Sequence, residues 1–103
     1  MNKRGPAGPL LFAKGGLLMV EFNYTLVGEE GLHARPAGNF AKKAQSYPEK
    51  ITVAKNGKKV DAKRLFSVIN LQINQGDEIV ITVEGDNEAA AAEDLKNYCI
   101  ANL

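Results

Sequence analysis

The fold is decided by residues 19–45, which read MVEFNYTLVGEEGLHARPAGNFAKKAQ. Apolar and polar residues alternate from Val20 to Leu26, and this period of two predicts a strand with one buried face. Further along, apolar residues recur every three or four positions, which predicts an amphipathic helix that ends before Pro48. The residues of that buried stripe are Ala34, Ala37, Phe40, Ala41 and Ala44.

The same two periods run through the rest of the chain. Strands are expected around Ile51 and Val53, over 58–61 and over 78–84, and Asn56-Gly57 predicts a type I′ hairpin turn between the first two. A short helix is expected around Leu65, Val68 and Ile69, and Asp86 or Asn87 can cap a last helix with the stripe Ala91, Leu95, Tyr98, Cys99 and Leu103. The order β-α-β-β-α-β-α predicts an α+β fold with a four-stranded antiparallel sheet and three helices on one face.

The bulk composition narrows the class of protein. A chain of 103 residues suits one small domain, and 13 basic against 12 acidic residues give a net charge of +1, which argues against a general nucleic-acid binder. The single cysteine, Cys99, excludes an intrachain disulfide and suits a reducing cytoplasm. One histidine and one cysteine argue against a zinc site, and no apolar stretch approaches the roughly 20 residues that span a bilayer.

Residues 1–18 differ in composition from the remainder, which is expected to be the folded domain at 19–103. The apolar run before Lys14 is too short for a signal peptide, so a flexible N-terminal extension is expected. Two origins stay open: a tag, or a gene start placed too far upstream. The second is favoured because Lys14-Gly15-Gly16 can be encoded by a purine-rich ribosome-binding site just ahead of Met19.

The loop before the first long helix carries the residues with chemistry. His33 is the only histidine, and Arg35 follows two positions later. The helix could begin with His33 as its N-cap or only at Pro36, but either start places His33 beside free backbone N–H groups that favour an anion. A neutral imidazole is a nucleophile near neutral pH, and the same N–H groups and Arg35 would stabilise a phosphoryl group on it. The simpler alternative is a polar loop residue that only caps a helix.

The sequence resembles a known family in this loop and beyond it. Gly31-Leu32-His33-Ala34-Arg35-Pro36-Ala37 resembles the active-site signature of HPr, the histidine-containing phosphocarrier of the bacterial phosphoenolpyruvate-dependent sugar phosphotransferase system. The similarity continues through Asn56-Gly57-Lys58-Lys59-Val60, residues 63–71 and Gly76-Asp77-Glu78-Ile79, and covers roughly residues 19–103. It implies the open-faced β-sandwich of that family.

The resemblance implies a role for each site residue. His33 would accept phosphate on Nδ1 from enzyme I and donate it to an enzyme IIA, while Ala34 and Arg35 would bind the phosphoryl group. The docking surface for these partners would comprise Ala34, Gly38, Leu65, Phe66 and Ile69. Leu65 and Ile69 fit core packing equally well, whereas Phe66 falls off the buried stripe and is the better candidate for an exposed contact. A cytoplasmic monomer with no cofactor, no metal and no turnover of its own is expected.

Two positions depart from the family pattern. Arg64 stands where many members carry a regulatory serine, so regulation by HPr kinase at that position is not expected, and Ser67 is only a weak alternative acceptor. Glu30 lies near the histidine, where some members have a small or amide side chain, and its carboxylate would tune the affinity for phosphate. Two other functions remain open: a nitrogen-type or dihydroxyacetone-kinase-type phosphorelay, and a regulatory binding module that is not phosphorylated.

Overall fold

The computed structural model describes residues 19–85 and 87–103. Its elements follow the predicted order β-α-β-β-α-β-α. The strands are β1 (Met19–Thr25), β2 (Lys50–Lys55), β3 (Lys58–Asp61) and β4 (Glu78–Glu84), and the helices are α1 (Ala34–Gln45), α2 (Leu65–Asn70) and α3 (Glu88–Asn102). The extension expected at 1–18 and the capping role considered for Asp86 lie outside the described residues.

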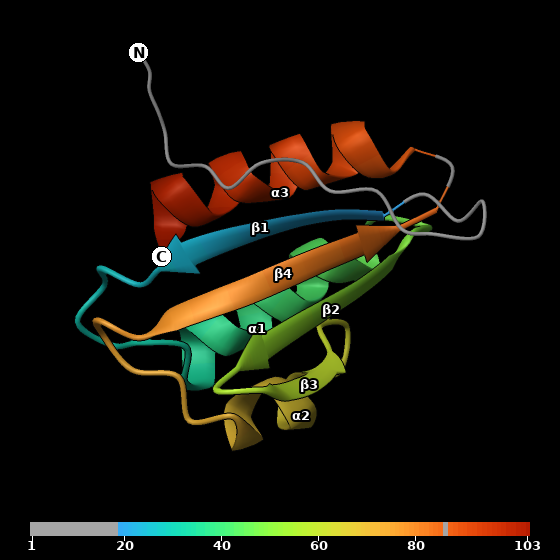
Figure 1. The fold of residues 1–103 in the computed structure, drawn as a ribbon. Coiled ribbons are helices and arrows are strands. Elements are labelled where there is room, and N and C mark those ends of the chain that lie inside the picture. Colours follow the sequence, from blue (N-terminus) through green and yellow to red (C-terminus); the bar gives the residue numbers. More distant parts are fainter. Residues whose placement is uncertain (1–18, 86) are drawn as a thin grey trace, which may run out of the picture.

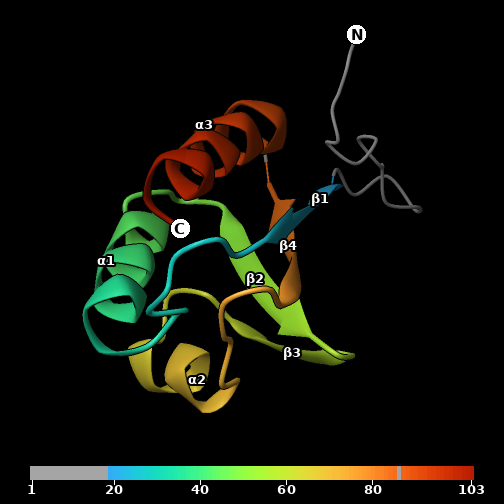
Figure 2. The same cartoon turned by 90° about the vertical axis from the view of Figure 1, so that its left-hand side faces the viewer.

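The four strands form one antiparallel sheet in the order β1-β4-β2-β3. All three helices lie on the same face of this sheet (Figures 1 and 2). On that face, apolar residues of neighbouring strands lie opposite one another. Ile81 of β4 pairs with Phe22 of β1 on one side and with Val53 of β2 on the other. The predicted α+β architecture is therefore confirmed.

The hairpin between β2 and β3 has the predicted turn. Asn56 and Gly57 have φ values of 53° and 85°, and Lys55 pairs with Lys58 across the turn. Positive φ at both central residues is the signature of type I′, whose twist matches that of the flanking strands.

The core lies between the sheet and the helices. From α1 it receives Phe40 and the small residues Ala37, Ala41 and Ala44, all of which are buried. From α3 it receives Ala91, Leu95 and Cys99, which are buried, and Tyr98, which is half-buried. Leu103, just after α3, completes the predicted stripe and is buried as well. Both long helices thus turn their periodic apolar faces toward the core.

One member of the α1 stripe was predicted wrongly. Ala34 is exposed, because its φ of 41° places it in the left-handed region and breaks the helical stripe at its first position. The other end follows the prediction, since α1 ends at Gln45 with Ser46 as C-cap, two residues before Pro48. Within residues 19–85 and 87–103, none of the helices has the length and apolar character that a bilayer crossing requires.

Candidate functional site

His33 lies at the junction of the β1–α1 loop and α1. It is the N-cap residue, with φ −117° and ψ 162°, and its carbonyl accepts the first helical hydrogen bond from the Ala37 N–H at 3.3 Å. Of the two helix starts that the sequence left open, the structure has the one at His33. Its side chain makes no capping hydrogen bond, so the half-buried ring is free for other contacts.

The first turn of α1 presents backbone donors next to His33. The N–H groups of Ala34 and Arg35 have no acceptor among the described residues. A helix start carries a partial positive charge, so two donors at this position suit an anion beside the imidazole. The left-handed Ala34 marks the site further, since non-glycine residues with positive φ cost energy and concentrate at functional sites.

Arg35 is exposed and lines a surface depression of about 400 Å³. Glu29 and Glu30 line the same depression and are exposed as well. In the described part of the chain, Arg35 forms no ion pair and no hydrogen bond with His33 or with either glutamate. Its guanidinium group is therefore not committed to a protein partner.

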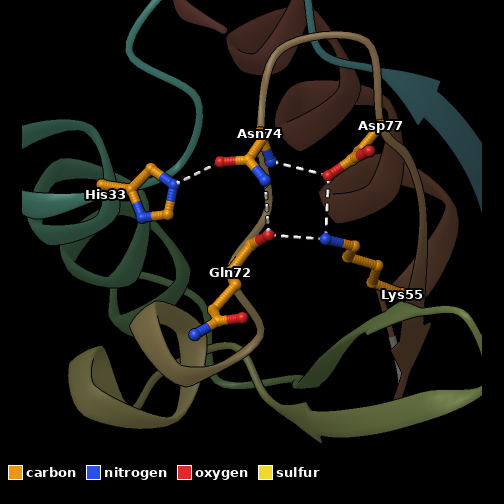
Figure 3. A network of polar contacts seen from close by, with 5 residues as sticks. All are labelled: His33, Lys55, Gln72, Asn74 and Asp77. Atoms are coloured by element: carbon orange, nitrogen blue, oxygen red, sulfur yellow. Dashed lines mark hydrogen bonds and ion pairs between the residues drawn. The ribbon is translucent and has the colours of Figure 1, made fainter.

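The imidazole contacts a residue from a distant loop. His33 Nε2 lies 2.9 Å from Asn74 Oδ1, on the segment between α2 and β4 (Figure 3). The backbones of the two segments also touch, because the Leu32 N–H donates to the Ile73 carbonyl at 2.8 Å. Sequence reasoning missed Asn74, since 41 residues separate it from His33 and nothing in its local pattern signals a functional role.

The residues expected to dock partners lie on α1 and α2. Phe66 is 76% exposed, as its position off the buried stripe predicted. Leu65 and Ile69 are half-buried and pack against the core, and their role in docking stays a prediction. Ala34 is exposed and Gly38 is half-buried.

The resemblance places the position of the regulatory serine at the start of α2. Arg64 is the N-cap residue of that helix and is exposed, with its Nε 3.7 Å from Asp61 Oδ2. Ser67, one turn along, is half-buried.

Comparisons with known proteins identify the family. The family described as the PTS HPr component phosphorylation site matches residues 20–100. The chain belongs to the HPr family of phosphocarrier proteins.

Relatives of this HPr-family chain cover nearly all of its fold. The phosphocarrier protein HPr of Borreliella burgdorferi is 39% identical over 77 residues, which are 75% of this chain and 90% of the relative. A crystal structure of HPr from Bacillus anthracis has a TM-score of 0.74 at 36% identity and covers 79% of this chain and 96% of its own. A solution structure of Crh, the catabolite repression HPr of Bacillus subtilis, has a TM-score of 0.57 at 31% identity over 78% of this chain and 95% of its own.

Proposed function

We propose that this HPr-family protein accepts a phosphoryl group from enzyme I on Nδ1 of His33 and passes it to enzyme IIA components for sugar uptake. The observation that carries the proposal is the position of the only histidine at the start of α1, beside the unpaired N–H groups of Ala34 and Arg35 in the described structure. A nucleophile and an anion site within one turn are what transfer through a phosphohistidine requires.

Arg35 and the helix start hold the transferred group. The two N–H donors and the guanidinium face a phosphoryl group whose negative charge increases their hydrogen-bond strength. Glu30, in the depression beside Arg35, opposes them through its charge and so tunes how tightly phosphate is held.

The partners bind the exposed surface of α1 and α2 around His33. Phe66, which is 76% exposed, supplies an apolar contact, and Ala34, Gly38, Leu65 and Ile69 complete the surface. A carrier must leave each partner, so the surface is small and the encounters are brief. The protein acts as a cytoplasmic monomer without cofactor or metal, and as a substrate and donor rather than an enzyme with its own turnover.

Regulation differs from that of relatives with a serine at the start of α2. Arg64 occupies the N-cap position there and cannot be phosphorylated by HPr kinase. Its permanent positive charge is also the opposite of a phosphoserine. Partner binding is therefore not switched off from this position.

The test is the mass of the intact protein after incubation with phosphoenolpyruvate and a competent enzyme I. Wild type should gain one acid-labile phosphoryl group, and His33→Ala should gain none. Absence of any gain in wild type would contradict the proposal and favour a binding module that is not phosphorylated. If the protein is such a binding module, His33→Ala should leave its control of partners intact. A separate observation distinguishes the two phosphocarrier functions: sugar permease genes beside this gene would favour sugar transport over a phosphorelay.

A further inference from the structure

A closed ring of polar contacts lies beside His33 (Figure 3). Lys55 Nζ, at the end of β2, lies 2.8 Å from Asp77 Oδ2 and also donates to the carbonyl of Gln72. Asp77 Oδ2 accepts the backbone N–H of Asn74 at 2.7 Å, and Asn74 Nδ2 donates to the same Gln72 carbonyl at 3.2 Å. The backbone and the side chain of Asn74 are thus both held by the ring.

The ring decides which way the Asn74 amide points. The Gln72 carbonyl can only accept, so the group of Asn74 that faces it must be the NH₂. The amide oxygen therefore faces His33, 2.9 Å from Nε2. Because that oxygen can only accept as well, Nε2 must carry a proton, and in the neutral ring the lone pair is on Nδ1.

The ring is anchored in the sheet rather than in the loop alone. The Lys55 side chain is only 16% exposed, and it bridges β2 to the segment that leads into β4. It also holds the carbonyl of Gln72, whose φ of 55° is a left-handed conformation that a glutamine does not favour. The lysine thereby fixes the backbone from which Asn74 reaches the imidazole.

We infer that Asn74, held by Lys55 and Asp77, is a positioning residue that keeps His33 in the Nε2-protonated tautomer and so directs the phosphoryl group to Nδ1. This inference rests on the proposed function. In the transfer step, the Nδ1 lone pair forms the bond to phosphorus while the bond from phosphorus to the donor's leaving atom breaks, and that electron pair stays with the donor.

The contact to Asn74 strengthens as the phosphoryl group arrives. Nε2 keeps its proton throughout, so no base has to remove a proton from His33. The ring gains positive charge when Nδ1 binds phosphorus, and a hydrogen bond from a charged donor is stronger than one from a neutral donor. Asn74 therefore stabilises the transition state more than the resting ring.

The first measurement is nitrogen NMR spectroscopy of protein labelled only in histidine, at a pH where the ring is neutral. Because His33 is the only histidine, the spectrum contains only its two ring nitrogens. Wild type should show a protonated Nε2 and an unprotonated Nδ1. Asn74→Ala should move both signals toward a mixture of tautomers, while Asn74→Asp, which keeps an acceptor at this position, should restore the single tautomer.

The second measurement is the rate of phosphoryl transfer from phosphorylated enzyme I. Loss of a hydrogen bond to a charged group corresponds to about a tenfold lower rate for Asn74→Ala. Lys55→Met and Asp77→Asn keep the Asn74 side chain but open the ring that holds it. Both variants should lower the transfer rate less than Asn74→Ala does and shift the tautomer only in part. Asn97→Ala, an exposed asparagine of α3 without a hydrogen bond from its side chain in the described structure, is the matched control and should behave as wild type.

The possible outcomes distinguish the role of Asn74 from the proposed phosphocarrier function. A proton on Nδ1 in wild type, or an Asn74→Ala variant with unchanged ring signals and unchanged rate, would overturn the role of Asn74. If the ring signals respond as expected but enzyme I does not phosphorylate wild type, the tautomer assignment is supported and the proposed function fails.

Discussion

At the scale of single residues, two glycines near His33 differ in the space that a side chain would have. Gly31 has a φ of 65°, and a Cβ there would lie 2.6 Å from the Ile73 carbonyl oxygen. Gly38 lies inside α1, and a Cβ there would meet nothing within 4 Å. We expect Gly31→Ala to lower the free energy of unfolding by about 2–5 kcal/mol, from strain and overpacking together.

Gly38→Ala should raise the free energy of unfolding by about 0.5–1 kcal/mol, because alanine loses less entropy in a helix. Urea denaturation of both variants measures the contrast. Equal effects of the two changes would show that the close approach of Gly31 to the Ile73 carbonyl has no energetic weight.

The exposed Arg35 side chain leads to a separate prediction about transfer. Arg35→Ala should slow phosphoryl transfer from enzyme I by about 10- to 100-fold, since it removes a charged hydrogen-bond donor from the phosphoryl group. The transfer rate of Arg35→Lys should fall between those of wild type and Arg35→Ala, because lysine keeps the charge but not the forked geometry of the guanidinium group. Both Arg35 variants should have the same midpoint of urea denaturation as wild type, because Arg35 makes no ion pair in the described structure. An unchanged transfer rate in Arg35→Ala would remove this residue from the mechanism.

At the scale of elements, α1 and α3 are joined by a polar cluster away from the site. Lys43 Nζ of α1 lies 3.1 Å from Asp94 Oδ2 of α3, and Tyr47, just after α1, donates its hydroxyl to the same carboxylate. The lysine also lies over the Tyr47 ring, 5.4 Å from its centroid. The pKa of Asp94 lies below its ordinary value of 3.8. The hydrogen bond from Tyr47 is the largest cause, and the one from Lys43 is the second.

This lowered pKa predicts a pH-dependent contribution to stability. A carboxylate with a lower pKa in the folded state stabilises the fold above its unfolded value and loses that effect as the pH falls through the folded value. Asp94 is 57% exposed, so screening limits the effect of Asp94→Asn to about 0.2–1 kcal/mol at neutral pH. In urea titrations the difference from wild type should shrink as the pH falls below 3.8 and through the lower folded pKa of Asp94. Glu93→Gln is the control, since Glu93 forms no ion pair within the described residues. A difference that persists in acid would assign the effect to packing.

The elements themselves could be predicted from the sequence to a large extent, because each has a buried face with a clear period. The alternation from Val20 to Leu26 and the stripe from Ala37 to Ala44 survive in the structure because burial selects the same residues that the period marks. Asn74 could not be found, since its contact with His33 depends on how two loops meet in three dimensions. Ala34 was misplaced for a related reason: periodicity assumes helical φ, and the loop imposes a positive one.

At the scale of the whole molecule, the family match covers residues 20–100. We propose that residues 19–103 can act as the carrier domain without residues 1–18. Removal of residues 1–18, with Met19 as the start, should therefore leave the thermal midpoint and the rate of phosphorylation by enzyme I unchanged.

The control for this deletion is the same shortened chain with His33→Ala, which should keep the midpoint and lose the phosphorylation. The two readouts distinguish the ways in which residues 1–18 could matter. A lower midpoint at an unchanged rate would mean that they pack against the domain. A slower transfer at an unchanged midpoint would place them in contact with a partner.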